Sequence, residues 1–83
     1  MANAPKMEDI HAVAYGSEGN FQTKVVGAKP ANTDGLMPVL EPINVDHQLI
    51  LWVPEETSGE VAQNLATHLV PDIRKSLIRE AAN

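Results

Sequence analysis

The feature that most constrains the fold is an apolar run followed at once by a long amphipathic segment. The run LILWVP spans residues 49–54, and the amphipathic segment continues to the end of the chain. An unbroken apolar run of this length predicts a central strand over residues 47–53, which Pro54 ends. In the segment that follows, apolar residues recur every four positions: Val61, Leu65, Leu69, Ile73 and Leu77, with Ala62, Ala66, Val70 and Ile78 widening the stripe. This spacing predicts a helix that packs on a sheet.

Local signals predict where this helix begins and where it is interrupted. The residues from Thr57 to Glu60 read TSGE, which fits a capping box with Thr57 at the N-cap and Glu60 at the third helical position. Pro71 removes one helical hydrogen bond and its ring clashes with the carbonyl of Thr67, at a cost of about 3 kcal/mol. We therefore expect a kink or a break at Pro71.

The preceding residues read as short strands joined by turns. Residues 10–15 and 21–26 alternate in polarity around a Gly-containing turn and predict an antiparallel hairpin. Residues 39–43 predict an edge strand, since Pro42 has no N–H to donate to a ladder. Residues 27–38 have loop composition, either as a mobile connector or as a binding loop.

The predicted fold class is α+β. We expect a small antiparallel sheet of three to four strands, built from two hairpins and covered on one face by the C-terminal helix. Residues 1–8 are expected to form a flexible N-terminal arm, and residues 9–83 a single domain. The order of the strands stays open.

Composition narrows the classes of function. The chain has 83 residues, no cysteine and a net charge of -5. The acidic balance argues against direct nucleic-acid binding, and the missing cysteines rule out disulfides and thiolate metal sites. No stretch approaches the roughly 20 apolar residues that span a bilayer, and residues 1–9 lack the apolar core of a signal peptide. We expect a cytoplasmic protein.

No catalytic or metal-binding pattern stands out. The three histidines, His11, His47 and His68, do not have the spacing of metal ligands. Asp46 and His47 could form a general-base pair, but the sequence indicates no nucleophile next to them. The sequence from Gly16 to Gly19 is too short for a phosphate-binding loop. We therefore expect no enzymatic activity, no cofactor and no bound metal.

Six residues are the candidates for a protein interface. Trp52 is either a core residue or, if it faces outward, an interface anchor, because tryptophan is enriched among binding hot spots. Leu69, Ile73 and Leu77 belong to a helix stripe wider than one small sheet needs. Arg74 and Arg79 either form a solvated face that matches the helix dipole or contact a partner.

Two functions from different classes fit these observations. The first is a small acidic protein-binding module, an accessory or inhibitory protein that acts stoichiometrically on a larger protein partner. Mimicry of nucleic acid by its acidic surface is a sub-case. The alternative is a structural subunit of a homo-oligomeric assembly or virion-type particle, because strand edges can pair and small chains gain stability by association.

Overall fold

A computed structural model describes residues 8–17 and 19–82 of the chain. Four strands precede one helix: β1 (Glu8–Tyr15), β2 (Gln22–Val26), β3 (Leu36–Pro42), β4 (His47–Pro54) and α1 (Gly59–Ala82). The α+β class with a C-terminal helix on a small sheet is confirmed. The arm expected over residues 1–8 lies outside the described residues, except for Glu8, which begins β1.

The sheet has the order β2-β1-β4-β3. Both predicted hairpins are present, because β1 pairs with β2 and β3 pairs with β4 in antiparallel fashion. The two hairpins meet at β1 and β4, which run parallel, so the sheet is mixed rather than antiparallel throughout. The reason is that β1 and β4 carry most of the buried apolar residues of the sheet, and their pairing places both in its centre.

The hairpin between β1 and β2 turns on glycines in the left-handed region of backbone conformation. Gly16 has a φ of 110° and Gly19 a φ of 86°. At Gly16 a Cβ atom would also lie 2.8 Å from the carbonyl oxygen of Asn20. A side chain at Gly16 is therefore opposed by both backbone conformation and space, as the turn prediction requires.

Helix α1 packs over β3, β4 and the core residues of β1, and it leaves the edge strand β2 uncovered. The core between them is built from alternate residues of β1 and β4 and one stripe of the helix: Ala12, Ala14, Leu49, Leu51, Val53, Ala62, Ala66, Val70 and Ile73, with Ile43 from the turn after β3. Ala62 and Ala66 are almost completely buried. Small side chains at these positions allow the helix backbone to lie close to the sheet.

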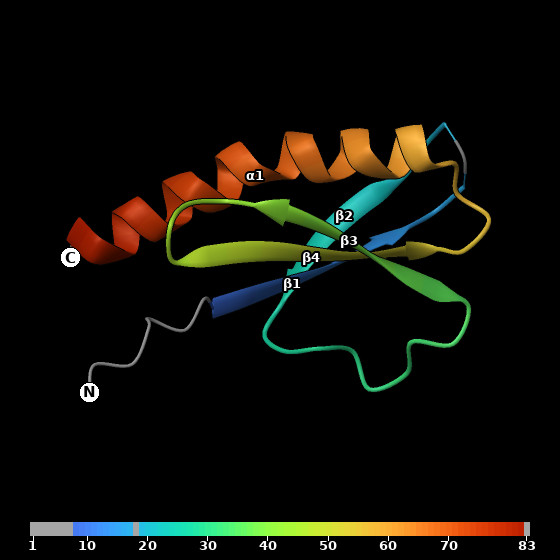
Figure 1. The fold of residues 1–83 in the computed structure, drawn as a ribbon, viewed down its shortest axis with the longest axis horizontal. Coiled ribbons are helices and arrows are strands. Elements are labelled where there is room, and N and C mark those ends of the chain that lie inside the picture. Colours follow the sequence, from blue (N-terminus) through green and yellow to red (C-terminus); the bar gives the residue numbers. More distant parts are fainter. Residues whose placement is uncertain (1–7, 18, 83) are drawn as a thin grey trace.

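Pro71 lies inside α1, which continues through it from Gly59 to Ala82. The expected break is therefore absent, while Figure 1 shows that the helix bends along its course. The interruption is tolerated because Pro71 is on the exposed side of the helix, away from the core stripe.

The helix begins one residue later than the capping-box prediction. The Val61 amide donates to Ser58 Oγ at 3.3 Å and the Ala62 amide to the Ser58 carbonyl, so Ser58 is the N-cap. Thr57 is instead buried beneath the helix start, with 7% of its surface exposed. Thr57 and Ser58 each carry a hydroxyl that can cap a helix. Because Thr57 is buried, Ser58 is the residue that caps it.

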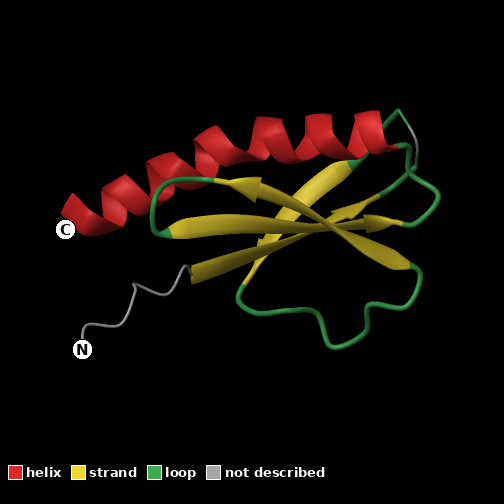
Figure 2. Cartoon of the chain, in the orientation of Figure 1, coloured by secondary structure: helices red, strands yellow, loops and turns green. Residues whose placement is uncertain are grey.

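The connection between β2 and β3 crosses the sheet on the face opposite the helix (Figures 1 and 2). It must span the whole sheet, because β2 and β3 are the two opposite edges. Its end is fixed by the Glu55 amide, which donates to the Gly35 carbonyl at 2.9 Å, and by the Leu36 amide, which donates to the Thr33 carbonyl. The loop is a covering element of the second face.

Candidate protein-binding surface

The six residues expected at an interface lie in three different places. Trp52 is on the face of the sheet opposite the helix, since it alternates with the core residues Leu51 and Val53. Ile73 is in the core with 5% exposure, and Leu69 and Leu77 are half-buried beside it. The structure therefore brings the three apolar helix residues together and separates them from the tryptophan.

Trp52 is covered by the long loop. The Lys29 ammonium lies 5.5 Å from the centre of the indole ring, within the range of a cation–π interaction. On its other side the indole Nε1–H lies 3.3 Å from Nδ1 of His11. Only 8% of Trp52 is exposed, although no helix lies over this face. In this conformation Trp52 packs between the loop and the sheet and is not available as an interface anchor.

The two arginines have different surroundings. Arg74 donates from Nε at 3.2 Å and from Nη2 at 2.8 Å to the carbonyl oxygen of Ile43. It thereby ties the second half of the helix to the turn between β3 and β4. Arg79 lies exposed near the C-terminal end of the helix. Arg74 thus has a structural contact within the chain, whereas Arg79 faces solvent.

An apolar groove lies between the second half of α1 and strands β1 and β2. It has a volume of about 350 Å³ and is lined by Ile10, Val25, Ile73, Ser76 and Leu77, which we call the open groove. Val25 is 48% exposed although it lies on the same face of the sheet as the core. The groove exists because the helix covers β1, β3 and β4 and leaves the edge strand β2 uncovered.

A second hollow continues the apolar surface along the helix. Val61, Asn64, Leu65 and His68 line a shallow depression of about 270 Å³ near the helix N-terminal half. Val61 and Leu65 are half-buried, so each presents part of its surface to solvent. The apolar flank of α1 is therefore longer than the open groove itself.

The two edges of the sheet differ in what they offer to another strand. The Ile43 amide donates to the His47 carbonyl, so odd-numbered residues of β3 turn their N–H groups toward β4. The outward backbone positions are then those of Leu36, Pro38, Leu40 and Pro42. The two prolines have no N–H and the Leu36 amide donates to the Thr33 carbonyl, which leaves Leu40 as the outward donor and blocks most pairing at this edge. Strand β2 contains no proline and keeps its outward donors.

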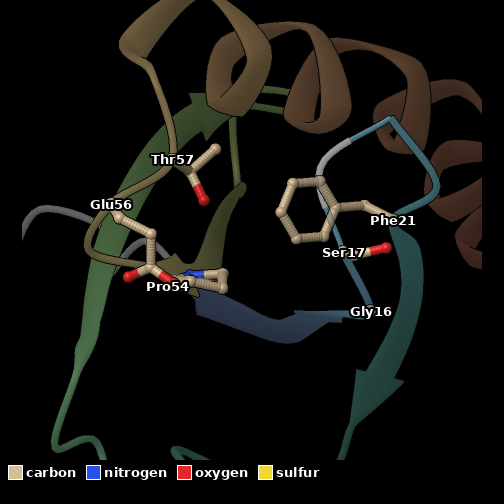
Figure 3. A pocket seen from close by; sticks show the side chains of 6 residues that line it. All are labelled: Gly16, Ser17, Phe21, Pro54, Glu56 and Thr57. Atoms are coloured by element: carbon tan, nitrogen blue, oxygen red, sulfur yellow. The ribbon is translucent and has the colours of Figure 1, made fainter.

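Figure 3 shows a cavity at the start of the helix. It has a volume of about 280 Å³ and is lined by Gly16, Ser17, Phe21, Pro54, Glu56 and Thr57. Thr57 Oγ1 has no hydrogen-bond partner within the described part of the chain. The cavity offers one carboxylate and two hydroxyls, and none of the three histidines lines it.

Among residues 8–17 and 19–82, no three acidic, histidine or cysteine side chains gather as metal ligands would. Within the same residues, no helix is both long enough and apolar enough to cross a bilayer.

Sequence reasoning missed the main residues of the open groove. Ile10, Val25 and Ser76 come from three separate elements, and their proximity depends on the strand order. The sequence did contain one signal for an exposed apolar surface, namely that it predicts one helix for up to four strands. A single helix covers only part of such a sheet.

Comparisons of the chain with protein-family models, with curated proteins and with solved structures found no significant match.

Proposed function

We propose that this chain is a non-catalytic protein-binding module that acts stoichiometrically on a larger protein partner, as an accessory or inhibitory protein. The observation that carries the proposal is the apolar surface at the β2 edge of the sheet, which the helix leaves uncovered. There the open groove presents apolar side chains that the chain's own helix leaves in contact with water.

Val25 and its neighbours would contribute favourable free energy when a partner covers them. Removing apolar surface from water contributes about 25 cal/mol per Å² before the costs of association are subtracted. Val25 is 48% exposed, and Ile10 and Leu77 are half-buried around it. A partner that covers these residues gains this term without having to unfold any part of the chain.

The net charge of the whole chain favours a partner of positive net charge. The chain carries a net charge of -5, while the exposed charges beside the groove residue Ser76 are mixed, with Asp72 four residues before it and Arg79 three residues after it. Complementary charge speeds encounter and selects the partner more than it adds affinity. A partner with an apolar contact surface and a positive net charge is therefore the one that fits best.

Capture from an extract of the native cell tests this proposal with two matched variants. Ser76 lines the groove, and Thr67 is exposed on the same helix and does not line it. Ser76→Glu and Thr67→Glu add the same charge at similar cost to the helix. We expect the wild type and Thr67→Glu to retain one partner near equal molar amounts, and Ser76→Glu to lose it.

Identical eluates from all three proteins would count against the groove as the binding surface. Both variants should first be shown to melt at the temperature of the wild type, so that loss of binding is not loss of the fold.

The second candidate is the structural subunit of a homo-oligomeric assembly. It is favoured by the proline-free β2 edge, which is open to strand pairing. Recovery of only the chain itself, in an assembly of defined size, would support this candidate over the binding module.

A further inference from the structure

We propose that two copies of this chain pair through their β2 strands, antiparallel and centred on Thr23, to form a closed two-fold dimer. The inference goes beyond the proposed function, since the open groove is complete in one copy. It rests on three features of the sheet: one open edge, one blocked edge, and a pattern along β2 that matches itself.

The two edges determine what kind of assembly can form. Pairing of β2 with β3 of another copy would repeat without end and give a filament. The outward prolines of β3, Pro38 and Pro42, oppose that pairing because each removes a ladder donor. Pairing of β2 with β2 uses the open edge of both copies and leaves none. The assembly therefore closes at two copies.

The charge of Lys24 excludes one register. In a two-fold antiparallel pair, one residue lies opposite its own copy, and its neighbours pair symmetrically about it. A pair centred on Lys24 would place two ammonium groups opposite each other, which is unfavourable. A pair centred on Thr23 places Lys24 opposite Gln22, and both are exposed. The like charges are then separated.

The register centred on Thr23 also gives favourable side-chain pairs on the face of the sheet that carries the core. There Thr23 lies opposite its own copy, and Phe21 lies opposite Val25 on both sides of the axis. Phe21 is half-buried and Val25 is 48% exposed in one copy. The pairing joins an aromatic to a β-branched side chain twice, which is a favourable combination in antiparallel sheets.

The dimer has a consequence for the proposed binding surface. Because the sheet continues across the axis, both helices lie on the same side of it. The two open grooves then face each other across β2 and its copy, with Val25 of each on the common floor. A partner would meet one apolar trough with two equivalent halves, which strengthens binding by two linked contacts.

Cysteine cross-linking tests the register directly, because the chain contains no cysteine of its own. Thr23→Cys should give a disulfide-linked dimer under mild oxidation, since residues opposite each other lie within the Cα separation a disulfide needs. The matched controls are Gln22→Cys and Lys24→Cys, each made separately. Each should remain largely uncross-linked alone, whereas a mixture of the two should cross-link.

Sedimentation over a range of concentrations gives the second readout. Gln22→Lys places the introduced ammonium opposite Lys24 and should weaken the dimer by about threefold to tenfold. Gln22→Glu places a carboxylate there and should strengthen it by a similar factor. The opposite signs at one exposed position distinguish the contact from a general loss of stability.

Three results would overturn the proposal. The wild type could remain a monomer at every concentration. It could form a dimer that Thr23→Cys does not cross-link, which would place the interface elsewhere. Its β2 edge could instead pair with a strand of another protein, seen as a Thr23→Cys cross-link to that protein alone in a native extract. In each case capture through the open groove, read with Ser76→Glu, still tests the proposed function separately.

Discussion

The two halves of this sheet differ in how many layers cover them. Strands β3 and β4 have the helix on one face, and at Trp52 the other face is covered by the loop between β2 and β3. In the other half the helix covers β1, whose Ala12 and Ala14 belong to the core, but not β2, so Val25 stays half exposed on the face that elsewhere forms the core. Strands β1, β3 and β4 thus share the buried core, whereas β2 leaves apolar surface exposed to solvent, where we propose that a partner binds.

The largest expected effect comes from placing the same charge in each half. Leu51 is fully buried in β4, whereas Val25 is 48% exposed in β2. Leu51→Asp should lower the free energy of unfolding by about 4 kcal/mol or more and abolish the folded state. Val25→Asp should lower it by about 1 kcal/mol or less. Thermal unfolding followed by circular dichroism measures both, and a cooperatively melting Leu51→Asp would show that β4 is not the core strand.

A smaller effect tests the close contact of the helix with the covered half. Ala66 is fully buried against the sheet, and Thr67 beside it is exposed. Ala66→Leu should lower the free energy of unfolding by about 1–3 kcal/mol, because the added atoms force the helix away from β4. Thr67→Leu should change it by about 0.5 kcal/mol or less. Denaturant titration of both proteins provides the comparison, and equal effects would contradict the tight packing at Ala66.

The two arginines of the helix should also differ in how much each contributes to the free energy of unfolding. Arg74→Ala removes two hydrogen bonds to the Ile43 carbonyl and should cost about 1–2 kcal/mol of stability. Arg79→Ala should cost about 0.5 kcal/mol or less, since Arg79 is exposed in the last turn. The midpoints of urea unfolding measure the difference. A more damaging Arg79→Ala would mean that this side chain has a structural contact.

The smallest effect concerns the loop that covers Trp52. Lys29→Ala removes the cation above the indole ring and should cost about 0.5–1 kcal/mol. Because Trp52 is the one tryptophan in the chain, its fluorescence reports on this site alone. We expect the emission to shift to longer wavelength as water reaches the ring. Unchanged emission would show that other loop residues shield the indole without Lys29.

Much of the fold could be predicted from local patterns. The apolar run identified β4 as the central strand, and Pro42 identified β3 as an edge. Both are local signals, since burial and the loss of a proline donor act on the strand itself. The parallel pairing of β1 with β4 joins residues about forty positions apart, and no local pattern reports it.

The candidate binding surface was harder to predict, because it too depends on contacts between residues far apart in the sequence. Trp52 was a candidate anchor by residue type, but the loop that crosses the second face covers it. Val25 and Ser76 carry no sequence signal of their own, and they lie together because the helix leaves the edge strand β2 uncovered. Surfaces of this kind follow from strand order, which single-residue preferences do not encode.

One measurement compares the two edges of the sheet directly. Leu40 in β3 is 56% exposed and Val25 in β2 is 48% exposed, so they are large apolar side chains of similar accessibility on opposite edges. A photoreactive side chain placed at each position in turn, and irradiated in an extract of the native cell, would report what lies against it. We expect covalent adducts, to a partner protein or to a second copy, from position 25 and little from position 40. Adducts from position 40 with none from position 25 would contradict it.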